Sequence, residues 1–262
     1  MEAQVITSRD NQFVKKCIKL FSSAKERRES GLFCLEGVRL CEDAVRSGIR
    51  FNALVVSFFA REKYADSINF LEDFTEKLYH VSDGVFKSIA DTATPQGIIG
   101  IAEIPDNNNK INTNGKYIAL ENIQDPSNLG AVSRSAEAFG ISGLILSRDC
   151  CDPYSPKALR ASMGALVRIP VIIAEDIIPF LKASSIKSFA CVVNKDAEKI
   201  NGVSFPEGSA AIIGNEGNGL RETTVSGADN RITIPMSGRA ESLNAAVAAS
   251  IVIWEMQRKC QC

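Results

Sequence analysis

The sequence predicts an α/β fold in two parts, and two observations support this prediction. Short, apolar, β-branched segments alternate with segments of helical period along the chain, as expected where helices cover both faces of a mostly parallel sheet. The alternation is interrupted at 106–115, a run rich in Asn that contains few residues to bury. We therefore predict a small α/β domain over 1–105, a linker over 106–115 and a larger α/β domain over 116–262.

In the first domain, a polar helix is expected over 9–30, before any strand. The next helix, over 37–47, has apolar residues at intervals of three and four and ends before Gly48, as helices often do. A third helix is expected between the strands at 53–57 and 77–81, and a fourth near 85–91. The strands are short apolar runs at 32–36, 53–57, 77–81 and 97–102.

In the second domain, the same alternation predicts helices over 128–139, 156–166, 177–182 and 242–258. Strands are expected at 117–121, 143–146, 171–173, 188–193, 210–213 and 232–234, all of them apolar and short.

The composition is that of an ordinary soluble protein, with 45% hydrophobic and 23% charged residues. No apolar run approaches the roughly 20 residues needed to cross a bilayer. The first residues are charged or carry amides, unlike a secretory signal, so we expect a cytoplasmic protein. The 8 cysteines include no C-x-x-C pair and the single histidine, His80, has no expected catalytic role, so no metal site is predicted.

The net charge of −1 and the pI of about 6.0 argue mildly against a nucleic-acid partner. Six basic residues nevertheless lie between Lys15 and Arg28, against one acidic residue, Glu26. This face either follows phosphates or is an ordinary solvated helix face, and the charge alone favours the second interpretation.

Three junctions between a strand and the following loop or helix carry candidate chemistry. In the first, over 120–134, a polar loop leads into a helix expected to begin near Ser127 or Asn128. Asn128 and Arg134 share the same broad side of this helix. We expect the helix to be largely buried, so the Arg134 guanidinium needs a partner, which is either a functional anion or an internal ion pair.

The second junction, over 212–220, has glycines at 214, 217 and 219 directly after a strand, which predicts a sharp turn or a close approach to a ligand. It matches neither the dinucleotide fingerprint nor the P-loop, which disfavours nicotinamide enzymes and nucleotide hydrolases. Glu216 would repel a phosphate and suits a cationic or hydroxyl-bearing ligand.

In the third junction, over 232–251, a strand stops at Pro235 and Ser242 is expected to cap a helix of small residues. Such a face permits close packing, either of a chain crossing or of a second subunit.

Taken together, the junctions resemble the motifs of the SpoU (TrmH-like) branch of the SPOUT RNA methyltransferases. The resembling residues are Asn-Leu-Gly-Ala-Val-Ser-Arg at 128–134, Ile-Gly-Asn-Glu-Gly-Asn-Gly-Leu at 213–220, and Ile-Pro-Met-Ser-Gly with Ser-Leu-Asn at 234–244. In the first domain, 33–39 and 94–97 resemble a small ribosomal-protein-like RNA-binding module. The runs 155–160 and 162–165 resemble a further region on the substrate side.

The resemblance implies an α/β fold whose C-terminal part is a trefoil knot, and a homodimer to which the knot and the last helix contribute. It also implies an enzyme that transfers a methyl group from S-adenosylmethionine to a ribose 2′-hydroxyl of rRNA or tRNA, with rRNA favoured. Carried over, the cofactor-binding positions are Gly214, Asn215, Gly219, Ile234, Met236 and Leu243, and the catalytic positions are Arg134, Asn128, Glu216, Ser242 and Asn244.

In the mechanism that this resemblance implies, Arg134 stays protonated, acts with an RNA phosphate and stabilises the negative charge developing on the ribose hydroxyl. Asn128, Ser242 and Asn244 hold it and the loops in place. Two alternatives remain: a pseudo-enzyme that only binds RNA or the ribosome, and a methyltransferase that protects one rRNA nucleotide against an antibiotic. The target nucleotide does not follow from the sequence.

Overall fold

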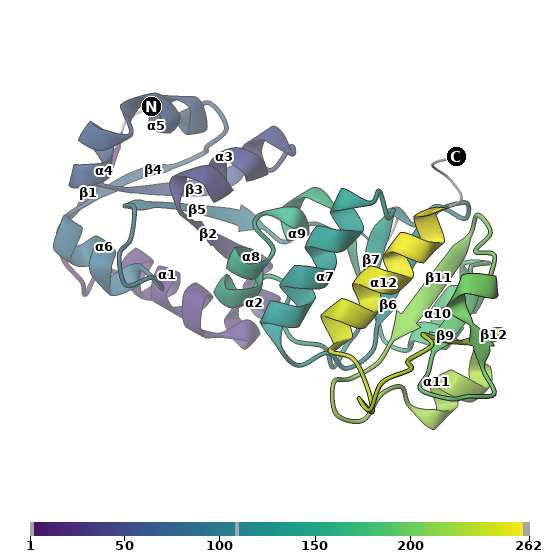
Figure 1. Ribbon diagram of the computed structural model, residues 1–262. Helices are drawn as coiled ribbons and strands as arrows, with labels where there is room; N and C mark the ends of the chain where they lie inside the picture. The colour runs from purple at the N-terminus through teal and green to yellow at the C-terminus, as the bar shows by residue number, and fades with distance from the viewer. Residues whose placement is uncertain (1–2, 108–109, 259–262) are drawn as a thin grey trace. The chain divides into compact units, whose positions relative to one another are not determined.

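The computed structural model describes residues 3–107 and 110–258, and its contacts divide them into two compact units (Figure 1). Unit 1 contains the described residues up to Pro105 together with Tyr154–Arg168, and unit 2 contains the rest. The contacts therefore place Tyr154–Arg168 with unit 1, although the sequence assigned it to the second domain. Asn108 and Asn109, in the predicted linker, lie outside the described residues.

Unit 1 is built on a five-stranded sheet of order β1-β4-β3-β5-β2. The pairs β1–β4 and β3–β4 are parallel, whereas β5 is antiparallel to both β3 and β2. The strands are β1 (Gln4–Ile6), which the sequence did not predict, β2 (Leu32–Glu36), β3 (Phe51–Ser57), β4 (Leu78–Val81) and β5 (Ile98–Glu103). The helices are α1 (Gln12–Ser22), α2 (Ala24–Ser30), α3 (Val38–Arg46), α4 (Phe58–Lys63), α5 (Ala65–Glu72) and α6 (Asp83–Ile89).

The single helix predicted over 9–30 is wrong, because the chain breaks at Ser23. This residue is extended, with φ −123°, and its hydroxyl accepts a hydrogen bond from the Glu26 amide at 3.2 Å, which caps α2. Arg27 is buried and donates to the carbonyl oxygens of Leu20 and Phe21 at the end of α1. It therefore does not belong to the basic face, whose other five members are exposed.

Unit 2 is a seven-stranded sheet of order β10-β12-β9-β11-β6-β7-β8 in which every pairing is parallel. Helices α7 and α12 lie side by side over one face (Figure 1). The strands are β6 (Lys116–Leu120), β7 (Gly143–Ser147), β8 (Val171–Ala174), β9 (Lys187–Cys191), β10 (Glu198–Lys199), β11 (Ser209–Ile213) and β12 (Asn230–Thr233). The helices are α7 (Pro126–Ala138), α10 (Ile177–Ala183), α11 (Glu222–Gly227) and α12 (Ala245–Arg258), with a short 3₁₀ turn, η2 (Ile200–Gly202).

Two predicted helix starts are wrong, in each case because another residue provides the cap. Asp125 caps α7, accepting from the Ser127 amide at 2.9 Å, and Pro126 occupies the first helical position. At α12, the side-chain oxygen of Asn244 accepts from the Ala246 amide at 2.9 Å, so Asn244 caps the helix in place of Ser242.

The segment Tyr154–Arg168 forms two short helices, α8 (Pro156–Ala161) and α9 (Ala165–Arg168), where one was predicted. Met163 and Gly164 separate them, with φ values of 48° and 87° that no α-helix accommodates. Within unit 1, the Tyr154 ring lies 4.9 Å from that of Phe33, and Arg160 forms an ion pair with Asp91 at 2.6 Å. Among the described residues, no helix is long and apolar enough to cross a membrane.

If α8 is part of the core of unit 1, Leu159→Ala will loosen β2, because Leu159 is fully buried and a Leu→Ala cavity costs roughly 2–5 kcal/mol. Hydrogen exchange followed by mass spectrometry should show faster exchange in β2 and no change in β11. Met163→Ala, at an exposed position of the same segment, is the control. Equal exchange of β2 in both variants would contradict the assignment of this segment to unit 1.

Candidate active site

The carboxyl ends of the parallel strands β9, β11 and β12 border a cavity of about 450 Å³ in unit 2, which we call the slot. Ligands of open α/β sheets bind at this edge. The slot is lined by the ends of three strands and the residues that follow them, by one residue of α11 and by residues at the start of α12. These are 191–193 at β9, 213–220 at β11, 233, 234 and 236 at β12, Val225 in α11, and 241–243, 245 and 248 around the start of α12.

The slot contains all six positions that the sequence assigned to a cofactor. Gly214, Asn215 and Gly219 come from the loop after β11, whereas Ile234, Met236 and Leu243 come from the segment between β12 and α12. Two of the predicted catalytic residues, Glu216 and Ser242, also line it. The structure therefore brings the second and third motifs together around one cavity.

The loop after β11 is a tight hairpin, and position 214 in it accommodates only glycine. The Asn215 amide donates to the Gly219 carbonyl and the Gly219 amide to the Asn215 carbonyl, each at 3.0 Å. A Cβ on Gly214 would lie 2.3 Å from the Gly219 carbonyl carbon and 2.4 Å from the Leu220 nitrogen. Any side chain at Gly214 would thus push the hairpin out of place.

Hydrogen bonds between side chains connect all three motifs. The amide nitrogen of Asn128 donates to Glu216 at 2.8 Å, and the amide nitrogen of Asn244 donates to the oxygen of Asn128 at 3.0 Å. Asn128 is therefore the link between the hairpin and the start of α12. This arrangement also orients the Glu216 carboxylate at the rim of the slot.

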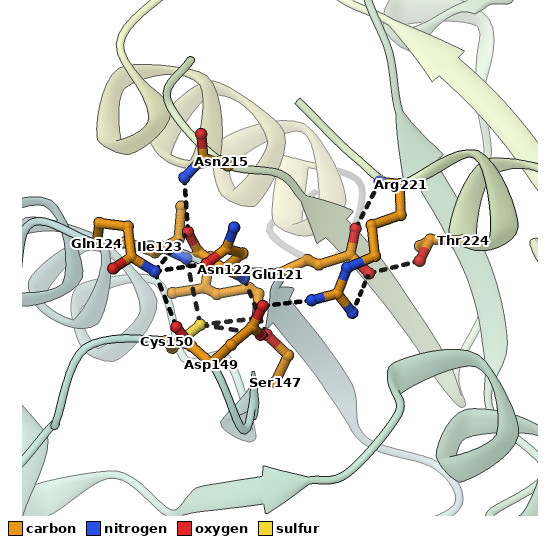
Figure 2. A network of polar contacts seen from close by, with 11 residues as sticks. Glu121, Asn122, Ile123, Gln124, Ser147, Asp149, Cys150, Asn215, Arg221 and Thr224 are labelled. Atoms are coloured by element: carbon orange, nitrogen blue, oxygen red, sulfur yellow. Dashed lines mark hydrogen bonds and ion pairs between the residues drawn. The ribbon is translucent and has the colours of Figure 1, made fainter. Parts of the chain in front are cut away.

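A second polar network, beneath the hairpin, was missed by sequence reasoning (Figure 2). The Glu121 carboxylate, only 2% exposed at the end of β6, accepts from the Arg221 amide at 2.8 Å and from the Thr224 hydroxyl. The Arg221 guanidinium also pairs with Asp149. An acidic residue directly after a buried strand requires such partners, and this was the signal available in the sequence.

The same network holds Asn122 in an uncommon backbone conformation. Its φ is +54°, its amide donates to the Ser147 hydroxyl at 2.9 Å, and its carbonyl accepts from the Asn215 side chain at 2.8 Å (Figure 2). A non-glycine residue at positive φ persists where its surroundings fix it. The loop after β6 is thereby attached to the hairpin after β11.

Arg134 is not where the sequence placed it. Helix α7 turns its buried face, with Leu129, Val132 and Ala136, toward the sheet, so that Arg134 is exposed. It lies on a shallow groove between α7 and α12 and not in the slot. Its guanidinium has no hydrogen bond or ion pair to another residue within the described part of the chain, so of the two partners that the sequence left open, the internal ion pair is absent there.

The slot offers neither a metal site nor a reactive thiol within the described residues. No cluster of three or more His, Cys, Asp or Glu residues suited to a metal occurs in that part of the chain. Cys191 lines the slot, and desolvation raises its pKa to about 11, so the thiol is protonated at neutral pH.

The fold and the slot define an α/β protein with a cavity suited to a small ligand at the carboxyl edge of a parallel sheet. The model of the SpoU rRNA Methylase family matches residues 115–254, and that of the MRM3-like substrate binding domain matches residues 11–100. This chain belongs to the SpoU rRNA methylase family.

Relatives of known name agree with this family. A 23S rRNA (guanosine(2553)-2′-O)-methyltransferase of Bacillus subtilis is 32% identical over 257 residues, covering 96% of this chain and 98% of its own. The mitochondrial rRNA methyltransferase 3 of Xenopus laevis is 29% identical over 313 residues, covering 94% of this chain and 74% of its own. Among solved structures, an AdoMet-bound rRNA methyltransferase from Sinorhizobium meliloti has a TM-score of 0.84 at 29% identity, covering 98% of each chain.

The link through Asn128 can be tested with a variant whose stability depends on pH. In Asn128→Asp, a second carboxylate would face Glu216, whose oxygen lies 2.8 Å from the Asn128 nitrogen, and the repulsion would raise the pKa of the pair in the folded state. Stability gained by the shared proton is present at low pH and lost as the pH rises through that raised pKa. The thermal midpoint of Asn128→Asp, relative to Asn128→Ala, should therefore fall from pH 5 to pH 8. A pH-independent difference would show that the two side chains do not interact.

Proposed function

We propose that this protein transfers a methyl group from S-adenosylmethionine to a ribose 2′-hydroxyl of RNA, with ribosomal RNA as the favoured substrate. The observation that carries this proposal is the slot, because the loops of two family motifs line it and Asn128 connects the third motif to both. The name of the Bacillus subtilis relative and the AdoMet-bound structure from Sinorhizobium meliloti support the reaction and the donor.

The residues of the slot fit S-adenosylmethionine. A volume of about 450 Å³ lies within the range of small-molecule sites. The apolar side chains of Ile234, Met236 and Leu243 line the slot and provide walls for an adenosine. The Glu216 carboxylate at the rim suits a cationic ligand better than a phosphate.

When bound, S-adenosylmethionine supplies a methyl group on a positively charged sulfur, and this charge disappears on transfer. The residues of the chain align the reactants and exclude water. Asn128 and Asn244 hold the hairpin against α12, which fixes the shape of the slot. Arg134 orients the ribose hydroxyl together with an RNA phosphate and stabilises its developing negative charge.

The exposed position of Arg134 leads us to place it in the site of a second subunit. The exposed side chains of Val247, Ile251 and Trp254 recur at intervals of four and three along α12, and with Arg134 they line the groove against α7. An apolar stripe on a helix surface is typical of an interface. We therefore propose a homodimer in which this groove faces its copy and Arg134 reaches the partner's slot.

Two further features are inferred from the family and its chemistry. We infer that the segment between β12 and α12 is threaded as a trefoil knot, which the position of Leu243 and Ala245 on the same cavity as the hairpin after β11 supports. We also place the protein in the cytoplasm, where bacterial ribosomal RNA is found.

The donor site is tested by two glycine substitutions in the same hairpin. Gly214→Ala should abolish binding of S-adenosylmethionine in calorimetry, since the added methyl group collides with the backbone of Gly219 and Leu220. Gly217→Ala is the matched control, because its Cβ would meet only the Asn215 side-chain oxygen at 3.6 Å. Unchanged binding in Gly214→Ala would place the donor outside the slot.

Arg134→Ala should lower the rate of methyl transfer by about 100-fold or more, as expected for the loss of a charged group that stabilises the transition state, with unchanged affinity for S-adenosylmethionine. The 2′-O-methyl positions mapped in RNA from cells with and without the protein supply the substrate for this assay. A rate within a few-fold of wild type in Arg134→Ala would refute the assignment.

The dimer is tested by mixing Arg134→Ala and Gly214→Ala chains. Each mixed dimer would retain one complete site, so random pairing should restore roughly a quarter of the wild-type rate. If Arg134 serves the slot of its own chain, the mixture will stay inactive.

A further inference from the structure

Two adjacent phenylalanines at the start of α4, in unit 1, are unusually exposed. Phe58 is 42% and Phe59 is 52% exposed, whereas every other phenylalanine of the described chain is buried or half-buried. Single exposed apolar residues are normal, but two neighbouring aromatic rings on the surface are a recognised sign of a contact with another molecule.

The backbone that carries these rings is held by two hydrogen bonds, and Arg9 in turn contacts the helix that supplies one of the acceptors. The Ser57 hydroxyl caps α4, accepting from the Ala60 amide at 3.1 Å. The Phe59 amide donates to the Asp83 carboxylate at 3.1 Å, and the guanidinium of Arg9, after β1, donates to the Gly84 carbonyl at 3.2 Å. The rings are therefore presented by a defined backbone, which lowers the entropy lost on binding.

Cationic groups accompany the aromatic pair. The Lys63 ammonium lies 5.2 Å from the centroid of the Phe59 ring and 5.2 Å from that of Tyr64. Arg9 lies beside Gly84, next to the residue whose carboxylate binds the Phe59 amide. Because that carboxylate, of Asp83, accepts a backbone hydrogen bond, part of its charge is compensated locally.

Aromatic rings with neighbouring cations match the chemistry of an unpaired nucleotide. A base stacks on an aromatic face whatever its identity, and a nearby ammonium or guanidinium attracts the adjoining phosphate. The protein as a whole carries a charge of −1, so attraction to phosphates over the entire surface does not explain how RNA is held. Stacking provides affinity that does not require a net positive charge.

We propose that Phe58 and Phe59, with the Lys63 ammonium over the Phe59 ring, form a platform on which unpaired bases of the RNA substrate stack. This inference rests on the proposed function and deepens it, because it assigns the RNA contact of unit 1 to one surface. It also specifies the part of the substrate, a single-stranded loop or end.

The chemistry is tested by substitutions at Phe59 that separate stacking from apolar contact. Phe59→Leu stays apolar but cannot stack, whereas Phe59→Tyr keeps the ring. With an rRNA fragment as substrate, Phe59→Leu and the double variant Phe58→Ala/Phe59→Ala should raise KM about ten-fold, in line with the loss of base stacking. The kcat and the affinity for S-adenosylmethionine should not change, and Phe59→Tyr should stay within about two-fold of wild type.

Ile173→Ala, which removes another exposed apolar side chain of the same protein, is the control and should have no effect. Direct binding of RNA, measured by fluorescence anisotropy without donor, should show the loss for a hairpin with an unpaired loop and not for a duplex of equal length. Ultraviolet cross-linking of the wild-type complex should yield a peptide from α4 joined to a loop nucleotide.

Three results would overturn the platform. The first is a KM for Phe59→Leu equal to that of Phe59→Tyr. The second is a change in oligomeric state, seen by sedimentation, in the double variant, which would identify the surface as a protein contact. The third is an equal loss of loop and duplex binding.

If wild-type protein binds S-adenosylmethionine but neither binds nor methylates RNA, the proposed function fails as well. This outcome is distinguishable because it does not depend on the phenylalanine variants.

Discussion

The hydrogen bonds of Asn128 to Glu216 and Asn244 are the interaction on which the geometry of the slot depends. They join three segments separated by 88 and 116 residues of sequence, each of which is a loop or the start of a helix. A parallel sheet brings the carboxyl ends of its strands to one edge, but it does not determine the conformation of the loops there. One amide with a donor and an acceptor can satisfy two neighbours at once, which makes Asn suited to this position.

The architecture could be predicted from the sequence because hydrophobic periodicity reflects burial, and burial determines secondary structure in a covered sheet. The errors occurred where a single residue provides a local alternative. Ser23 divides the predicted first helix since its hydroxyl caps α2. Asp125 caps the helix that was expected to begin near Ser127 or Asn128, and Asn244 caps the helix expected to begin at Ser242. Capping competes among adjacent polar residues, and the periodic pattern does not decide between them.

The placement of Tyr154–Arg168 shows a different limit. Its alternating pattern is that of any core helix, and nothing in the pattern identifies the core to which it belongs. Its contact with Phe33 and its ion pair with Asp91 join residues far apart in the sequence, which a local pattern does not reveal. The same reasoning applies to Glu121: an acidic residue at the end of a predicted apolar strand indicates a buried charge that needs a partner, but that partner, Arg221, is 100 residues away in the sequence. For the slot, by contrast, the resemblance predicted residues that the structure does bring together.

Arg134 shows how exposure bears on chemistry. Its charge, facing water, is strongly screened, and an isolated guanidinium there would do little to stabilise a developing anion. In the proposed dimer, the partner would cover the apolar stripe of Val247, Ile251 and Trp254 and so remove water from both the stripe and Arg134. Hydrophobic burial would then supply the free energy of association, and the lower dielectric would strengthen every interaction of the guanidinium. An arginine that is ineffective on an open surface thus becomes effective only where a second surface meets it, so that assembly and catalysis would depend on the same contact.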